Sequence, residues 1–235
     1  MIEQLPGVNV PIKLWAPKNE IETAALDQLQ KTSSLPWVYH HLAIMPDVHF
    51  GKGCCVGSVV AMQNAVSPAL CGVDIGCGMG AIKTNLTAND LPTSLKALRT
   101  KIEETIPVGF NRHAVSQSNV NTHALFSSFT KLHSKVQNLL STALEQCGTL
   151  GGGNHFIELC LDTDDNVWMM LHSGSRRMGK ELAEIHIDIA KTLSHNATII
   201  DKDLAVFLAG TKEMDDYRHD LYWAQRYAFL NRETM

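Results

Sequence analysis

Four glycine-rich segments constrain this chain most strongly, because each of them also carries side chains that can bind a metal ion. The potential ligands and the polar groups beside them are Asp47 and His49 in MPDVHFGKG, Asp74 and Cys77 in DIGCGMG, Asn154 and His155 in GGGNHFIE, and His172 in LHSGSR. Taken singly, each has an ordinary structural explanation, since a lone histidine at a strand end is more often hydrogen-bonded than a ligand. Taken together, an aspartate, a cysteine and two histidines are donors that suit a divalent transition ion.

The spacing of these residues favours one shared metal site. Asp74 and Cys77 are three positions apart, so one glycine-bearing turn can direct both toward a common point. His155 begins an expected strand, and His172 ends another about one hairpin later. A thiolate can also bridge two ions, which would let a single cysteine serve a dinuclear centre. Manganese and zinc both suit these donors.

The remaining sequence predicts a mixed, α+β fold without an internal repeat. Apolar residues at helical spacing predict helices over residues 20–31, 94–105, 124–146, 178–194 and 215–233. Short runs rich in branched residues predict strands over residues 42–48, 56–62, 80–86, 155–161 and 167–173. The polar segment 107–123 predicts a long surface loop.

Composition indicates a globular protein and gives no sign of a membrane-spanning segment or a disulfide scaffold. With 235 residues and 45% hydrophobic residues, the chain can form one large domain or two small ones. It contains no apolar run of about 18 residues, and its N-terminus does not resemble a signal peptide, so we expect a cytoplasmic protein without a membrane partner. Six scattered cysteines indicate reduced thiols. The net charge of −4 gives no general attraction to nucleic acid, so RNA would require a local basic patch or a bound cation.

Two segments can bind an anion. Three successive glycines before Asn154 can direct backbone N–H groups into one concavity, as in phosphate-binding loops, although a flexible turn is the alternative. Arg176 and Arg177 precede an expected helix, where an anion would meet both the guanidinium groups and the positive helix end. A solvated basic face is the alternative, and it suits Arg177 better than Arg176.

The blocks MPDVHFGKG, GVDIGCGMGAIKTNL, GTLGGGNHFIE and LHSGSRRMG, in this order, resemble the signature blocks of the RtcB family of RNA-splicing ligases. The similarity continues through DLAVFLAGTKEMDDYRHDLYWAQRYAFLNRE and covers the chain from about residue 40 onward. It implies a single RtcB-like domain over residues 1–235, with β-structure around a central metal cleft and surrounding helices. It also implies an enzyme of RNA repair or tRNA splicing that joins RNA with a 3′-phosphate or 2′,3′-cyclic phosphate to RNA with a 5′-hydroxyl. GTP and up to two Mn²⁺ ions are the implied cofactors.

The resemblance implies roles for individual residues. The implied manganese ligands are Asp74, Cys77, His155 and His172, with Cys77 shared between two ions. The implied guanylate contacts are Asn154 and Glu158, the implied contact to the RNA terminal phosphate is Arg176, and the implied supporting residues are Asp47 and His49.

The chain departs from the family pattern at its C-terminal end. The family histidine that accepts GMP, and one further manganese ligand, lie beyond anything corresponding to Met235, so the chain resembles a truncated member whose catalytic residue is not identified. His186, His195 and His219 lie in or beside ordinary helical patterns and are not substitutes. Two alternatives stay open, a metal-dependent RNA-end phosphoesterase and a non-catalytic module that binds RNA or a protein partner.

Overall fold

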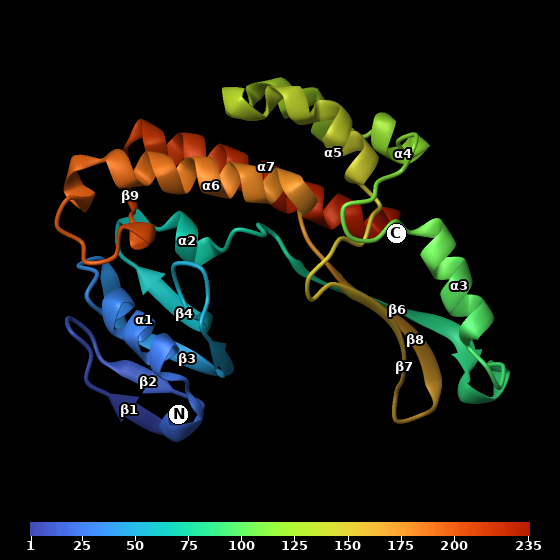
Figure 1. Ribbon diagram of the computed structural model, residues 1–235, viewed down its shortest axis with the longest axis horizontal. Helices are drawn as coiled ribbons and strands as arrows, with labels where there is room; N and C mark the ends of the chain where they lie inside the picture. The colour runs from blue at the N-terminus through green and yellow to red at the C-terminus, as the bar shows by residue number, and fades with distance from the viewer. The chain divides into compact units, whose positions relative to one another are not determined.

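A computed structural model describes all residues from Met1 to Met235, and it confirms the α+β class (Figure 1). The chain forms two compact units, residues 1–73 with 183–218 and residues 74–182 with 219–235. The helices α6 (Arg176–Thr192) and α7 (Lys212–Thr234) each begin in one unit and end in the other. A single domain over residues 1–235 stays a prediction. No helix has the length and apolar character needed to cross a membrane, and the cytoplasmic location also stays a prediction.

The first unit is built on a four-stranded sheet in the order β1-β2-β3-β4. Its strands are β1 (Glu3–Leu5), β2 (Ile12–Leu14), β3 (Val38–His49) and β4 (Val56–Met62). The helix α1 (Thr23–Ser33) connects the parallel pair β2 and β3. The side chains of Ile12, Leu29 and Leu42 are fully buried, so the core of this unit lies between α1 and the sheet. The smaller elements are the paired strands β5 (Ala65–Val66) and β9 (Phe207–Leu208), helix α2 (Pro68–Cys71), and the 3-10 helices η1 (Lys18–Glu20), η5 (Ser194–Asn196) and η6 (Lys202–Leu204).

The second unit contains an antiparallel three-stranded sheet in the order β6-β8-β7. Its strands are β6 (Gly78–Thr87), β7 (Phe156–Leu161) and β8 (Asn166–Ser173). In Figure 1, β7 and β8 form a hairpin that runs beside β6. The register places His172 of β8 between Met79 of β6 and Phe156 of β7. This arrangement brings three of the glycine-rich segments to one end of the sheet.

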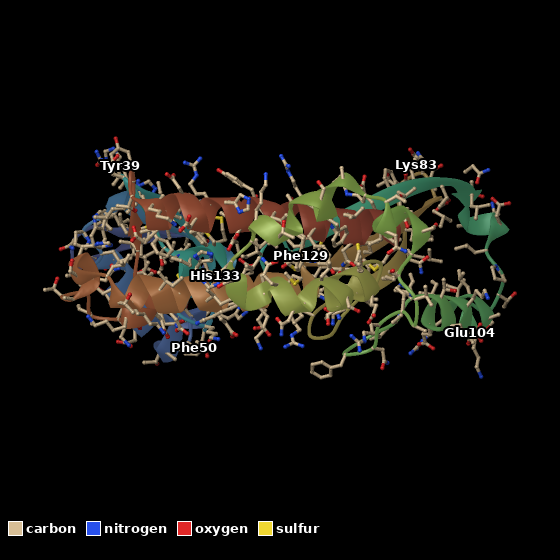
Figure 2. The ribbon with its side chains drawn as sticks, turned by 90° about the horizontal axis from the view of Figure 1, so that it is seen from above. Tyr39, Phe50, Lys83, Glu104, Phe129 and His133 are labelled. Carbon is tan, nitrogen blue, oxygen red and sulfur yellow. The ribbon has the colours of Figure 1, made fainter.

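Helical segments complete the second unit. They are η2 (Ala88–Asp90), α3 (Lys96–Thr105), α4 (Ser118–Asn121), η3 (Ala124–Lys131), η4 (Ser134–Leu139), α5 (Leu140–Gln146), the first part of α6 and the second part of α7. Trp223 and Tyr227 of α7 stack on each other with ring centroids 5.3 Å apart. The buried Phe129 of η3, labelled in Figure 2, meets Trp223 edge-on at 5.5 Å. This aromatic cluster packs η3 against α7.

The continuous helix expected over residues 124–146 is wrong. The segment consists of the separate elements η3, η4 and α5, and the backbone of Leu132 between η3 and η4 is extended. Nδ1 of His123 accepts a hydrogen bond from the Leu125 N–H, and Nδ1 of His133 accepts one from the Lys135 N–H. These histidine side chains cap two short 3-10 helices, so local capping outweighs the helical periodicity. The expected loop over residues 107–123 contains the single-turn α4 and one isolated β-bridge, between Val108 and Gly151.

Candidate metal centre

Three of the four predicted metal ligands converge at the end of the β6-β8-β7 sheet. Sγ of Cys77 lies 3.5 Å from Nε2 of His155 and 3.5 Å from Nε2 of His172. The three donor atoms all lie within 4.8 Å of one another. Such a group of soft and borderline donors fits a divalent transition ion.

The strand register explains part of this convergence. His172 is paired across the sheet with Met79 on one side and Phe156 on the other. Cys77 lies two residues before Met79, and His155 lies one residue before Phe156. Because strand side chains alternate between faces, Cys77 continues the face that carries Met79 and His172. Strand alternation does not place His155, which precedes β7 by one residue; its ring is oriented by its contacts with the Leu150 carbonyl and the Asp74 carboxylate.

His155 faces a hydrogen-bond acceptor with each of its ring nitrogens. Nδ1 lies 2.9 Å from the carbonyl oxygen of Leu150, and Nε2 lies 3.1 Å from Oδ2 of Asp74. A neutral imidazole carries only one N–H, so it can satisfy only one of these acceptors. If Nδ1 donates to Leu150, a cation beside Nε2 would satisfy both the imidazole lone pair and the carboxylate. The surroundings of His155 therefore fit a metal ligand whose tautomer is fixed by a backbone carbonyl.

Asp74, the fourth predicted ligand, is held by the start of α6. Its Oδ1 accepts hydrogen bonds from the Ser175 N–H at 2.9 Å and the Ser175 hydroxyl at 3.1 Å. A Cβ at position 174 would lie 2.1 Å from Oδ2 of Asp74, so only glycine allows this approach. Ser175 thus fixes one carboxylate oxygen and leaves Oδ2 directed toward His155.

The Cys77 thiol is held in its protonated form when no metal is bound. Desolvation, the nearby charge of Asp74 and a hydrogen bond with that carboxylate raise the pKa of Cys77 to about 12, although Arg232 acts in the opposite direction. A bound metal ion deprotonates a coordinating thiol outright. Binding of an ion at this cluster would therefore release a proton.

His172 is positioned differently from His155. Its Nδ1 is buried and has no hydrogen-bond partner. Its ring packs against the ring of Phe156, with centroids 5.7 Å apart, and edge-on against the ring of His155 at 5.4 Å. Ring packing and the strand backbone therefore fix His172.

Arg176 lies beside the cluster and begins α6. Its Nε donates to the Thr149 hydroxyl at 2.9 Å, and its Nη2 donates to the Gly109 carbonyl at 2.9 Å. Burial lowers the pKa of Arg176. A Cβ at position 151 would lie 1.7 Å from Nη1 of Arg176 and 2.8 Å from Nδ1 of His155, so Gly151 separates the guanidinium from the imidazole. Arg176 has a φ of 51°, and Gly151 has a φ of 92°.

The two predicted nucleotide contacts flank the cluster. Asn154 is exposed in the loop immediately before His155. Glu158 is exposed on β7, two residues after Phe156, and therefore lies on the same face of the sheet as His172. The Cys160 thiol donates a weak hydrogen bond to the Glu158 carboxylate at 3.4 Å. Both side chains are exposed, and Glu158 is open to a ligand on this face.

The predicted supporting residues lie in the first unit. Asp47 and His49 are exposed near the end of β3, where the pairing with β4 is irregular. Nδ1 of His49 lies 2.7 Å from the backbone carbonyl of Asp47. Their supporting role stays a prediction.

The chain also matches known proteins. The sequence profile of a family described as "tRNA-splicing ligase RtcB" matches residues 28–235. The chain belongs to the RtcB family. RNA-splicing ligase RtcB of Escherichia coli (strain K12) is 42% identical over an alignment of 247 residues that covers 99% of the chain. tRNA-splicing ligase RtcB of Methanococcus maripaludis is 26% identical over 92% of the chain. The chain spans 60% of the length of the first of these relatives and 54% of the second.

Sequence reasoning missed residues that shape the centre of this RtcB-family chain. Ser175 and Gly174 belong to the block LHSGSRRMG, but nothing in that block indicates that they would meet Asp74, which is 101 positions from Ser175. Arg232 gave no signal either, because it donates to the carbonyl of Gly76, which is 156 positions away in the sequence.

The other histidines named from the sequence have separate surroundings. His186 is buried, and its ring packs against Phe207 and Tyr217. Nε2 of His195 lies 2.9 Å from the Val206 carbonyl, and Nδ1 of His219 lies 3.1 Å from the carboxylate of Asp220. None belongs to the group of donors around Cys77.

Proposed function

We propose that this chain provides the metal and nucleotide site of an RNA ligase that depends on GTP and Mn²⁺. The reaction joins RNA ending in a 3′-phosphate or 2′,3′-cyclic phosphate to RNA with a 5′-hydroxyl, in RNA repair or tRNA splicing. The observation that carries the proposal is the convergence of Cys77, His155 and His172 within a chain of the RtcB family. The printed names of its relatives, which are RNA-splicing and tRNA-splicing ligases, support the same reaction.

Each residue of the cluster would supply a different donor atom to the ion. Cys77 supplies the thiolate, and His155 and His172 supply imidazole nitrogens. Asp74 offers Oδ2 beside Nε2 of His155, while Ser175 holds its other oxygen. A bound divalent ion would withdraw charge from the oxygens of a phosphate.

The surrounding residues would bind and orient the substrates. Glu158 would accept hydrogen bonds from the guanine edge, and Asn154 would contact the phosphate of the guanylate. Arg176 would orient the RNA terminal phosphate, since a guanidinium matches the oxygens of a phosphate in geometry and charge. In support of this division, Asn154, Glu158 and Arg176 lie in the loops and strand that surround the Cys77 cluster.

Incubation of the full chain with Mn²⁺ and α-labelled GTP tests the proposal. We expect Mn²⁺-dependent retention of the label by the native chain, and none by Cys77→Ala. The variant Cys71→Ala is the matched control, because Cys71 is an exposed thiol outside the cluster. We expect no labelled band on a denaturing gel, because no residue of the chain matches the family histidine that accepts GMP.

Three outcomes would contradict parts of this assignment. Absence of retained label with every variant would overturn the metal and nucleotide site. A labelled band that survives denaturation and disappears in Cys77→Ala would show that a residue within 1–235 accepts GMP. Release of inorganic phosphate from RNA with a 3′-phosphate would replace ligation by a phosphoesterase reaction.

A further inference from the structure

The last turn of α7 contacts the loops that carry the metal ligands, although it supplies no ligand. Asn231 is completely buried at this turn, and Arg232 follows it. Both residues and all their partners belong to the second unit. The hydrogen bonds of this pair connect three glycine-rich loops.

Asn231 binds two of these loops with both ends of its amide. Its Oδ1 accepts hydrogen bonds from the N–H groups of Gly148 at 2.8 Å and Thr149 at 3.1 Å. Its Nδ2 lies 3.2 Å from the Thr149 carbonyl, 3.1 Å from the Gly174 carbonyl and 3.1 Å from the Ser173 hydroxyl. The side chain thus joins the loop before His155 to the loop after His172.

A relay of hydrogen bonds extends from Asn231 to a ligand. The Ser173 hydroxyl accepts a hydrogen bond from Nδ2 of Asn231 and donates one to the Leu150 carbonyl at 2.8 Å. The same carbonyl lies 2.9 Å from Nδ1 of His155. Ser173 is fully buried, so water does not replace these contacts. Asn231 therefore helps to place the carbonyl that faces Nδ1 of His155.

Arg232 joins the remaining loop to the same strand end. Its Nη1 donates to the carbonyl of Gly76 at 2.8 Å and to the carbonyl of Ser173 at 3.0 Å. Gly76 immediately precedes Cys77, and Ser173 immediately follows His172. One guanidinium nitrogen therefore spans the backbone beside two of the three clustered ligands.

We infer that Asn231 and Arg232 are positioning residues, through which the end of α7 sets the spacing of Cys77, His155 and His172. The inference rests on the proposed metal-dependent function. Glycine-rich loops lose much conformational entropy when they are ordered. Additional hydrogen bonds are therefore needed to hold the ligands that these loops carry at a fixed separation. The buried hydrogen bonds of Asn231 and the charge-assisted hydrogen bonds of the half-buried Arg232 hold these loops in place.

Titration of the full chain with Co²⁺, followed by absorption spectroscopy, tests the inference. Co²⁺ reports both affinity, from the titration curve, and the ligand set, from its thiolate charge-transfer band. We expect Arg232→Met to weaken Co²⁺ binding about 10- to 100-fold, the range found for residues that orient metal ligands. We also expect a weaker thiolate charge-transfer band per bound ion, because the turn at Gly76 and Cys77 loses its hydrogen bond from Arg232. Arg232→Lys keeps a donor and should restore part of both signals.

The matched control is Arg226→Met, which removes the same charge from an exposed position of the same helix. This variant should bind Co²⁺ as the native chain does. Asn231→Ser, which retains a smaller polar group, tests the second loop, and circular dichroism identifies any variant that has not folded.

The outcomes separate the two proposals. A native chain that binds no Co²⁺ overturns the metal centre itself. A native chain that binds Co²⁺, with Arg232→Met unchanged in affinity and in thiolate band, overturns only the positioning role. An equal loss in Arg226→Met would assign the effect to net charge. A loss of affinity with an unchanged band per bound ion would reduce Arg232 to a general stabilising residue.

Discussion

The end of β3 and the end of the β6-β8-β7 sheet contain the same kinds of residues, but only the second gathers its donor atoms. Asp47 and His49 on β3 are exposed, and His49 makes a local contact with the backbone of Asp47. The pairing of β3 with β4 is irregular at this point. In the second sheet, the register is regular near the cluster and shifts only farther along β6, between Lys83 and Thr87. His172 is paired on both sides, and three donors lie within 4.8 Å of one another. Potential ligands beside glycines thus form a cluster where strand pairing aligns them.

The largest expected effect separates these two regions directly. Cys77→Ala removes a donor that contacts both histidines, so metal affinity should fall by more than about 100-fold, beyond the range for residues outside the ligand set. His49→Ala should have a much smaller effect, since His49 lies outside the close group. Isothermal titration calorimetry with Mn²⁺ measures both. Equal losses would show that the two regions act as one site.

A smaller effect is expected from the backbone that supports Asp74. In Gly174→Ala, the new Cβ would lie 2.1 Å from Oδ2 and 2.4 Å from Cγ of Asp74. Such overpacking typically lowers the free energy of unfolding by about 1–3 kcal/mol, and it should also weaken metal binding because the carboxylate must move. Urea unfolding measures the first effect, and calorimetric titration the second.

Gly80→Ala is the matched control for this substitution. No atom lies within 4 Å of a Cβ built at position 80 of β6, so the free energy of unfolding should change by less than about 0.5 kcal/mol. Equal destabilisation of the two variants would contradict the close approach at Gly174.

The smallest effect is expected at the turn that holds the register of β7 and β8. The Asp162 carboxylate accepts hydrogen bonds from Nε1 of Trp168 at 2.9 Å and from the side chain and backbone N–H of Asn166. These bonds, with Trp168 the strongest, hold the pKa of Asp162 below its usual range. Because its folded pKa is lowered, Asp162 stabilises the fold above its unfolded pKa of about 3.9 and loses this contribution as the pH falls further.

Asp162→Ala should therefore lower the melting temperature by a few degrees at neutral pH, with a smaller difference toward pH 2. Thermal unfolding as a function of pH provides the measurement. Asp164→Ala removes an exposed carboxylate from the same turn and should leave the melting temperature unchanged. A pH-independent difference for Asp162→Ala would mean that packing, rather than the carboxylate, holds the register.

Local patterns predicted most of the sheet elements. The strand over residues 56–62 agrees with β4 in both bounds, and the strand over residues 155–161 begins one residue before β7. The strands β1, β2, β5 and β9 were missed because two or three residues are too few for an alternation to be recognised. The failure at residues 124–146 has another cause, since histidine caps and an extended Leu132 interrupt a segment whose apolar spacing is helical.

The ligand group of the candidate site could be predicted from the sequence, but the contacts that hold its side chains could not. Residue type and glycine context predicted Asp74, Cys77, His155 and His172 as one group, and three of them form a close cluster with Asp74 beside His155. Sequence spacing could not predict that Ser175 would hold Asp74, because the two residues are 101 positions apart. Such contacts depend on how the chain folds back, which no local pattern determines.

The unusual backbone of Arg176 has a consequence for protein engineering. A φ of 51° places this residue in the left-handed region, which is unfavourable by roughly 1–2 kcal/mol for residues that carry a Cβ. Glycine and asparagine adopt this conformation at lower cost than arginine. The chain carries an arginine here, and its guanidinium lies beside His155, so the unfavourable backbone coincides with a charged group at the candidate metal centre. Attempts to make the protein more heat-resistant should therefore leave the Arg176 backbone unchanged and turn to exposed loops such as residues 107–123.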